Sequence, residues 1–305
     1  MELQGVVYGV YHKGFPPQTA GLQDRTTFYI SPKTLSLASI KIFWHMGCYK
    51  FIAKLSHSSF RFLKKLTDFL DTLFSGFWLG VMSEKSLDFS DELFYNRTKQ
   101  YTEEKYNQSG LFEWEKVMIE KHFSKLRNIL LIAAGGGRET LALIRMGFEV
   151  DSYECNPKLI EFGNLLLNRN NIGNQIKYLP RNSVPGENKK YDGIIVGWGA
   201  YSLIQGNKKR FSFLSGLYPF LSKETPLMIS FLHVEKKTRK DKMIRNISNI
   251  FRFFSHKDKT ELGDRLVPDF IHYFDEEEIK NELVQTKFRI IDFSKDEYGC
   301  VIAGI

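Results

Sequence analysis

The sequence has few cysteines and no long uncharged segment. Its three cysteines, Cys48, Cys155 and Cys300, lie far apart and lack the spacing of metal ligands. They indicate reduced thiols in a cytoplasmic protein, with no metal site. In the aromatic region before residue 83, the longest uncharged run is Thr72 to Ser83, which is too short to span a bilayer. No Lys and Arg cluster precedes an apolar segment near the start, so no secretory signal is predicted.

The sequence also lacks a recognisable nucleic-acid-binding module. It has 43 Lys and Arg against 35 Asp and Glu, which gives a net charge of +8. The basic residues are dispersed among acidic ones, so a nucleic-acid partner is disfavoured. Hydrophobic residues make up 43% of the 305 positions, enough for a substantial core.

The most informative segment runs from Asn128 to Pro157. Its apolar run from Ile129 to Ala133 fits a strand buried on both faces, and Gly135-Gly136-Gly137 follow at once. A helix is predicted from Arg138 to Gly147, and Phe148 to Glu154 supply a second strand. This β-α-β unit places the glycines at the carboxyl end of the first strand, where open parallel sheets bind ligands.

These residue types suit an adenosine-type cofactor. Glycines without Cβ let the backbone lie against a ligand, and the free N–H groups of a helix start favour negative charge. Glu154 comes seventeen positions after Gly137. A carboxylate at the tip of the neighbouring strand can accept two hydrogen bonds from a ribose diol.

With these residues the sequence resembles the class I S-adenosylmethionine-dependent methyltransferases. The first motif of that family is a strand followed by Gly-x-Gly-x-Gly, to which Ala133-Ala134-Gly135-Gly136-Gly137 corresponds, and its acid matches Glu154. Two positions depart from the family. Ala133 replaces the first glycine, and Leu131 stands where an acid frequently lies, which removes one expected contact to the methionine end of the cofactor.

Further matches reach the C-terminus and imply the fold class. The third strand begins at Ile176, the fourth lies within Tyr191 to Tyr201, and the fifth is Leu227 to Leu232. The last two are predicted within Phe288 to Phe293 and Gly299 to Gly304. The resemblance implies an α/β, doubly wound, mostly parallel seven-stranded sheet with an antiparallel C-terminal strand, preceded by a helical region.

The resemblance implies S-adenosylmethionine as the cofactor and a methyl-transfer site at the tip of the fourth strand. There Trp198 and Tyr201 offer ring faces to a sulfonium or a flat substrate, although the same rings could instead seal the sheet edge. Asn182 matches the turn that approaches the adenine. The cofactor contacts expected are Ala133, Gly135, Gly136, Gly137, Glu154, Cys155, Asn182, Ser183, Gly197 and Trp198.

Three residues are candidates for the catalytic group. Tyr201 borders the expected methyl position. His233 follows the fifth strand, and His272 precedes a helix capped by Asp275; either histidine could take a proton from an attacking hydroxyl or amine. A lone histidine is more often structural than catalytic, so the structural interpretation is favoured for each.

Three regions are predicted: a loop-rich segment at 1–33 from its glycines and prolines, a helical region at 34–125, and, from the resemblance, the cofactor-binding domain at 126–305. Residues 34–82 are aromatic and basic. A helix of this kind can lie on an anionic membrane surface or meet a lipid-like substrate. Alternatively, its apolar face packs against the core or against a second subunit in a homodimer.

A helical lead-in is predicted before the sheet. Ser90 or Asp91 can cap its first helix, and the segment from Asn107 to Gly110 reads as a turn. In the resembling family such helices close over the cofactor and build part of the substrate pocket. The expected substrate contacts are Tyr95, Tyr101, Tyr106, Trp114 and Tyr201, although core packing explains any one of these rings equally well.

A strongly basic segment, Glu235 to Glu261, follows the fifth strand. Such a run is usually a solvated helix face, but the resembling family inserts substrate-cap elements at this place.

Three functions are compatible with the sequence. The first is methyl transfer from S-adenosylmethionine to a small-molecule acceptor, including a lipid-like one. The second is aminopropyl transfer, because the glycine turn also resembles that of spermidine-synthase-like enzymes; these need acids after the fourth strand, where this chain has Gly-Trp-Gly-Ala-Tyr. The third is a nicotinamide-dependent oxidoreductase or a non-catalytic nucleotide binder, for which the third fingerprint glycine would fall at Thr140.

Overall fold

A computed structural model describes residues 37–186, 189–295 and 298–305, with side chains from residue 49 onward. The predicted loop-rich segment 1–33 lies outside these residues. The chain divides into two compact units, Met1–Phe62 and Leu63–Ile305. Helix α1 (Leu37–Val81) begins in the first unit and ends in the second.

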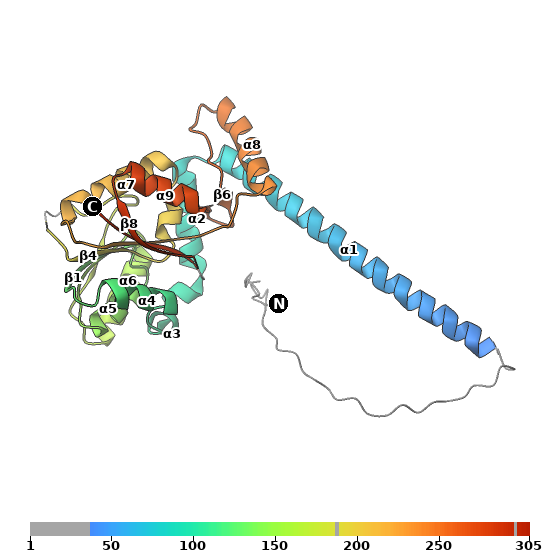
Figure 1. The fold of residues 1–305 in the computed structure, drawn as a ribbon, viewed down its shortest axis with the longest axis horizontal. Helices are drawn as coiled ribbons and strands as arrows, with labels where there is room; N and C mark the ends of the chain where they lie inside the picture. Colours follow the sequence, from blue (N-terminus) through green and yellow to red (C-terminus); the bar gives the residue numbers. More distant parts are fainter. Residues whose placement is uncertain (1–36, 187–188, 296–297) are drawn as a thin grey trace, which may run out of the picture. The chain divides into compact units, whose positions relative to one another are not determined.

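The second unit is built on one seven-stranded sheet with the order β3-β2-β1-β4-β5-β9-β8 (Figure 1). Strands β1 to β5 pair in parallel, whereas β9 pairs antiparallel with both β5 and β8. The predicted sheet, including its antiparallel C-terminal strand, is therefore confirmed. The strands are β1 (Asn128–Ile132), β2 (Glu149–Glu154), β3 (Ile176–Tyr178), β4 (Gly193–Val196), β5 (Leu227–Phe231), β8 (Arg289–Ser294) and β9 (Gly299–Gly304).

Helices cover both faces of the sheet because its strands are apolar on both sides. Alternate residues of β1 show this: Leu130 and Ile132 pack in one cluster, while Ile129 and Leu131 pack in the other. The first cluster includes α7 (Asn207–Gly216), η3 (Tyr218–Phe220) and α9 (Glu276–Gln285). The second includes α4 (Glu113–His122), α5 (Arg138–Arg145) and α6 (Pro157–Arg169). The architecture is a three-layer α/β sandwich.

The lead-in consists of α2 (Glu84–Arg97), η1 (Lys99–Thr102), α3 (Glu104–Asn107) and α4. The prediction that Ser90 or Asp91 caps the first of these helices is wrong. The cap is Ser83, whose Oγ accepts a hydrogen bond from the backbone N–H of Ser86 at 3.2 Å, so α2 begins seven or eight residues earlier than predicted. Asp91 consequently lies inside the helix and is buried.

Between β5 and α9 the chain inserts α8 (Arg239–Phe254) and a short hairpin of β6 (Asp264–Leu266) and β7 (Phe270–His272). The end of α1 packs on this insertion: the Oγ of Ser75 accepts a hydrogen bond from the N–H of Leu266 at 2.8 Å. Among the described residues, no helix combines the length and apolarity needed to cross a membrane.

Candidate functional site

The glycine turn joins β1 to α5. Ala133, Gly135 and Gly137 have φ angles of 64°, 55° and 94°, in the left-handed region that glycine adopts most easily. Ala133 therefore occupies a conformation that the family's glycine would adopt without strain. No atom lies within 4 Å of the point where a Cβ on Gly135 would be, so the backbone there is open to a ligand.

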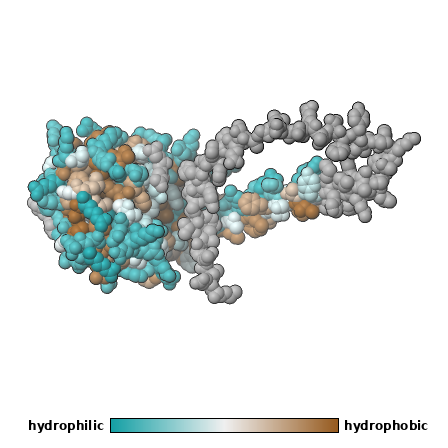
Figure 2. Space-filling model, turned by 90° about the horizontal axis from the view of Figure 1, so that it is seen from below, coloured by the Kyte–Doolittle hydropathy of each residue, from teal (hydrophilic) through white to brown (hydrophobic). Residues whose placement is uncertain are grey.

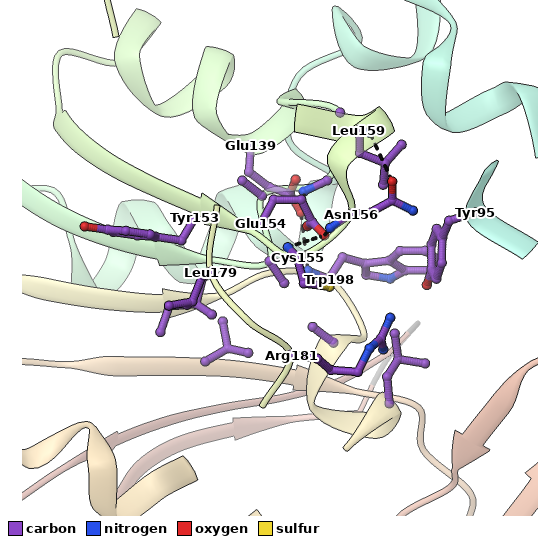
Figure 3. A pocket seen from close by; sticks show the side chains of 18 of the residues that line it. Tyr95, Glu139, Tyr153, Glu154, Cys155, Asn156, Leu159, Leu179, Arg181 and Trp198 are labelled. Carbon is purple, nitrogen blue, oxygen red and sulfur yellow. Dashed lines mark hydrogen bonds between the residues drawn. The ribbon is translucent and has the colours of Figure 1, made fainter. Parts of the chain in front are cut away.

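Glu154 is the last residue of β2 and lies beside Cys155 and Asn156 (Figure 3). One of its carboxylate oxygens accepts a hydrogen bond from the N–H of Gly135 at 2.9 Å. The other accepts from the N–H groups of Cys155 at 2.8 Å and Asn156 at 2.9 Å. A carboxylate has about four acceptor positions, so three backbone donors orient the group and leave it able to accept another hydrogen bond.

A cavity with an empty volume of about 1060 Å³, including its solvent-open part, lies at the carboxyl edge of β1 to β4. It brings together most of the residues predicted from the sequence, from both the sheet and the lead-in. The predicted residues that line it are Ala133, Gly135, Gly136, Glu154, Cys155, Asn182, Ser183, Trp198, Tyr95, Tyr101 and Tyr106.

Three predicted contacts lie next to the cavity but do not line it. Gly137 is the residue from which α5 starts. A Cβ on Gly197 would meet the carbonyl oxygen of Ala133 at 2.2 Å, so this glycine permits β4 to pass close behind the turn. Trp114 packs against the ring of Tyr298, with 5.9 Å between the centroids, and is buried with α4 in the core.

Tyr201 also lies outside the cavity. Its ring is fully buried and stacks on Phe274, and its hydroxyl donates to Glu282 at 2.7 Å. Burial, and then the carboxylate of Glu282, raise the pKa of Tyr201 well above 10. The structure therefore gives Tyr201 a place in the core, where it joins η2 (Ala200–Leu203) to α9.

Neither predicted histidine lines the cavity. His272 is fully buried between Asp264, 2.6 Å from Nδ1, and Glu278, 3.0 Å from Nε2. Burial alone would lower its pKa, but the hydrogen bonds with both carboxylates raise it above 6.5. Both ring nitrogens of His233 are buried without a hydrogen-bond partner.

Glu261, Asp264 and His272 offer oxygen and nitrogen atoms within 4.8 Å of one another, a grouping that the sequence did not indicate. Arg210 forms an ion pair with Glu261 at 2.7 Å, so this carboxylate already has a positively charged partner from the protein.

The lead-in forms the wall opposite the sheet. A Cβ on Gly136 would meet the carbonyl oxygen of Tyr101 at 2.4 Å and the side-chain oxygen of Asn107 at 2.8 Å, so this segment lies directly against the glycine turn. Arg138, the first residue of α5, donates two hydrogen bonds to the buried Glu115 of α4 at 2.7 and 2.8 Å. This bidentate ion pair holds α4 of the lead-in against α5, the helix that follows the glycine turn.

The sequence did not indicate a cluster of three charged residues, Asp91, Arg181 and Asp269, because they are distant from one another in the chain. Arg181, after β3, forms an ion pair with Asp91 of α2. The carboxyl of Asp269 lies close enough to that of Asp91 for their charges to interact. Burial, and then the charge of Asp91, raise the pKa of Asp269 to about 7. Asp269 therefore changes its charge near neutral pH beside Asp91, which lines the cavity.

The tyrosine hydroxyls and the Cys155 thiol of the wall stay neutral near pH 7. Burial is the main cause: it raises the pKa of Tyr95 and Tyr101 well above 10 and that of Tyr106 to about 12. Burial, and then the charge of Glu154, raise the pKa of the Cys155 thiol to about 12. The phenol groups consequently act as hydrogen-bond donors and ring surfaces.

Two buried donors in the wall have no hydrogen-bond partner, the side-chain Nδ2 of Asn156 and the indole Nε1 of Trp198. Buried polar groups are normally paired, so these atoms indicate a missing acceptor. They flank the tips of β2 and β4 (Figure 3). Oxygen and ring-nitrogen acceptors of an adenosine-type cofactor fit this donor set.

The fold is similar to that of solved methyltransferases. An S-adenosylmethionine-dependent methyltransferase from Methanosarcina mazei matches with a TM-score of 0.51 and 17% identity, covering 64% of this chain and 98% of that one. This chain has the class I methyltransferase fold.

Two other solved structures match with lower TM-scores. An S-adenosylmethionine-dependent methyltransferase from Clostridium acetobutylicum gives a TM-score of 0.48 and 9% identity, over 72% of this chain and 96% of that one. The PH0226 protein from Pyrococcus horikoshii gives 0.49 and 12%, over 70% and 98%. No family model matches the chain, and no curated protein matches its sequence.

Proposed function

We propose that the chain is an S-adenosylmethionine-dependent methyltransferase that acts on a small-molecule acceptor. The observation that carries this proposal is the junction of the glycine turn with Glu154 at the edge of a cavity with unpaired donors. The methyltransferase fold supports it.

Individual residues receive the following roles. Gly135 and Gly137 shape the turn, Glu154 accepts hydrogen bonds from the ribose hydroxyls, and Asn182 approaches the adenine. Trp198 borders the methyl group. The cofactor supplies an already activated methyl, so the protein chiefly aligns the acceptor in line with the methyl–sulfur bond and excludes water.

Asp91, supported by Asp269, is the group suited to take a proton from an acceptor that loses one. Asp91 lines the cavity, whereas His233, His272 and Tyr201 do not. Burial raises the pKa of Asp91 above 3.8, which makes its carboxylate a stronger base than that of an exposed aspartate.

The cavity wall favours an acceptor with a flat or apolar part. Tyr95 and Tyr101 lie with their ring centroids 4.9 Å apart, and Tyr101 and Tyr106 with theirs 6.0 Å apart. A lipid-like acceptor is consistent with such a wall. Peripheral membrane contact and homodimer formation through residues 34–82 stay predictions.

Aminopropyl transfer is the weaker alternative. Among the described cavity residues, those that follow β4 are Trp198, Ala200, Leu203, Ile204 and Phe213, and they include no acid that could bind a polyamine.

Calorimetric titration with S-adenosylmethionine, S-adenosylhomocysteine, decarboxylated S-adenosylmethionine and NAD tests the proposal. We expect micromolar binding of the first two alone. Preference for the decarboxylated compound would indicate aminopropyl transfer, and binding of none would refute the cofactor site.

A further inference from the structure

Within Leu63–Val81, the face of α1 that packs on α8 and on the β6–β7 hairpin is not its apolar face. Within Leu63–Val81, the residues buried against the insertion are Thr72, Ser75, Gly76, Leu79 and Gly80. A Cβ on Gly76 would meet the Cβ of Ile247 at 2.8 Å, and one on Gly80 would meet that of Phe251 at 2.7 Å. Small side chains thus allow α1 and α8 to lie in close contact.

The apolar stripe of α1 consequently stays exposed. Leu63, Leu66, Leu70, Leu73 and Phe77 follow one another at helical spacing, with exposed fractions from 38% to 57%. Figure 2 shows hydrophobic side chains uncovered along the described part of α1. Within the described part of Leu63–Ile305, no other element covers this stripe.

Helix α8 extends the exposed apolar surface. The rings of Phe77 and Phe251 meet edge to face with 5.2 Å between centroids, which joins the stripe to α8. On α8, Ile250 is 58% exposed, and Phe253 and Phe254 are each 76% exposed. We call the stripe from Leu63 to Phe77, together with Ile250, Phe251, Phe253 and Phe254, the α1–α8 surface.

Positive charge is concentrated on the same two helices. Helix α8 has five Lys and Arg against one Asp. Helix α1 has six against two, but four of its six, Lys41, Lys50, Lys54 and Arg61, precede the stripe, whereas Leu63–Val81 has two Lys against two Asp. Together they carry a net +8, which equals the net charge of the whole chain. All other residues are therefore balanced in charge.

We propose that the α1–α8 surface docks on an anionic phospholipid bilayer, with its apolar side chains inserted at the headgroup boundary. Exposed Phe and Leu beside Lys and Arg are the chemistry that such a boundary binds. A second copy of this surface would bring two positive faces together, which opposes self-association. The proposal concerns location and does not depend on methyl transfer.

Vesicle flotation of the full chain tests the proposal, using phosphatidylcholine vesicles with and without phosphatidylglycerol. We expect binding to the anionic vesicles that weakens as salt is raised. The double variant Ile250→Glu/Phe254→Glu should weaken it by about tenfold or more, because two apolar groups are lost from the inserted face. Val284→Glu, at a 65% exposed position of α9, is the matched control and should bind like the wild type.

Circular dichroism and urea unfolding show whether each variant keeps its fold. The proposal is wrong if the wild-type chain does not bind anionic vesicles. It is also wrong if the double variant and the control bind equally. Sedimentation velocity tests the other occupant. If the wild type is a dimer, the double variant is a monomer and neither binds vesicles, the surface binds a second copy instead. None of these results bears on cofactor binding.

Discussion

At the scale of single residues, Glu154 is the central group of the site. Replacing it with Ala should weaken S-adenosylmethionine binding by about 1 to 3 kcal/mol, the cost of leaving polar partners unpaired. The N–H of Gly135 also loses its acceptor, which destabilises the glycine turn with or without the cofactor. Glu149→Ala is a matched control, since it changes an exposed glutamate at the other end of β2. Isothermal titration measures both, and equal affinities would remove Glu154 from the site.

Asp269 should make stability depend on pH. Its pKa in the folded chain is about 7, above the ordinary 3.8, so the folded state holds this proton more tightly than the unfolded state. The resulting stabilisation is complete below pH 3.8 and is lost as pH rises through about 7. A shift of this size corresponds to at most about 4 kcal/mol.

Asp269→Asn removes that titration. Urea unfolding at about pH 5 and about pH 8 should therefore show a smaller loss of stability for this variant than for the wild type. Asp258→Asn, at an exposed position, should follow the wild type. An Asp269→Asn profile parallel to the wild type would show that the carboxyl pair does not titrate in this range.

At the scale of elements, the contact between the lead-in and the glycine turn is the one that closes the cavity. Gly136→Ala should push η1 and α3 away, because its Cβ would lie 2.4 Å from the Tyr101 carbonyl oxygen. We expect a destabilisation of about 1 to 3 kcal/mol, as for other overpacked positions. Gly173→Ala meets no atom within 4 Å and should be near neutral. Urea denaturation compares the two; equal stability would mean that the lead-in adjusts without cost.

The elements that local patterns predict are those of the sheet. An apolar run, a glycine turn and a periodic helix lie within thirty residues here, and their order determines a β-α-β unit. The start of α2 was misjudged because Ser83 and Ser90 both precede possible helices. Which ring faces the cavity depends on contacts between distant elements, so the sequence did not distinguish Tyr95 from Tyr201. The Asp91–Asp269 pair, 178 positions apart, had no local signal.

At the scale of the whole molecule, the described cavity residues lie between Asp91 and Phe213, inside the unit Leu63–Ile305. A chain that begins at Leu63 should therefore bind S-adenosylhomocysteine within about twofold of the full chain, a difference below about 0.4 kcal/mol. The same truncation should weaken vesicle binding, because it removes Lys and Arg from α1. Calorimetry and flotation test the two parts separately. Loss of cofactor affinity would show that residues 1–62 contribute to the site.

The position of β9 in the sheet affects how the protein is made. This strand is formed by residues 299–304, yet it lies between β5 and β8. A ribosome must release residue 304 before those two strands gain their shared neighbour. Until then each presents unpaired backbone groups to other chains. Folding of the sheet must therefore finish after synthesis of this strand, and slow release or crowded expression should favour aggregation of the nascent protein.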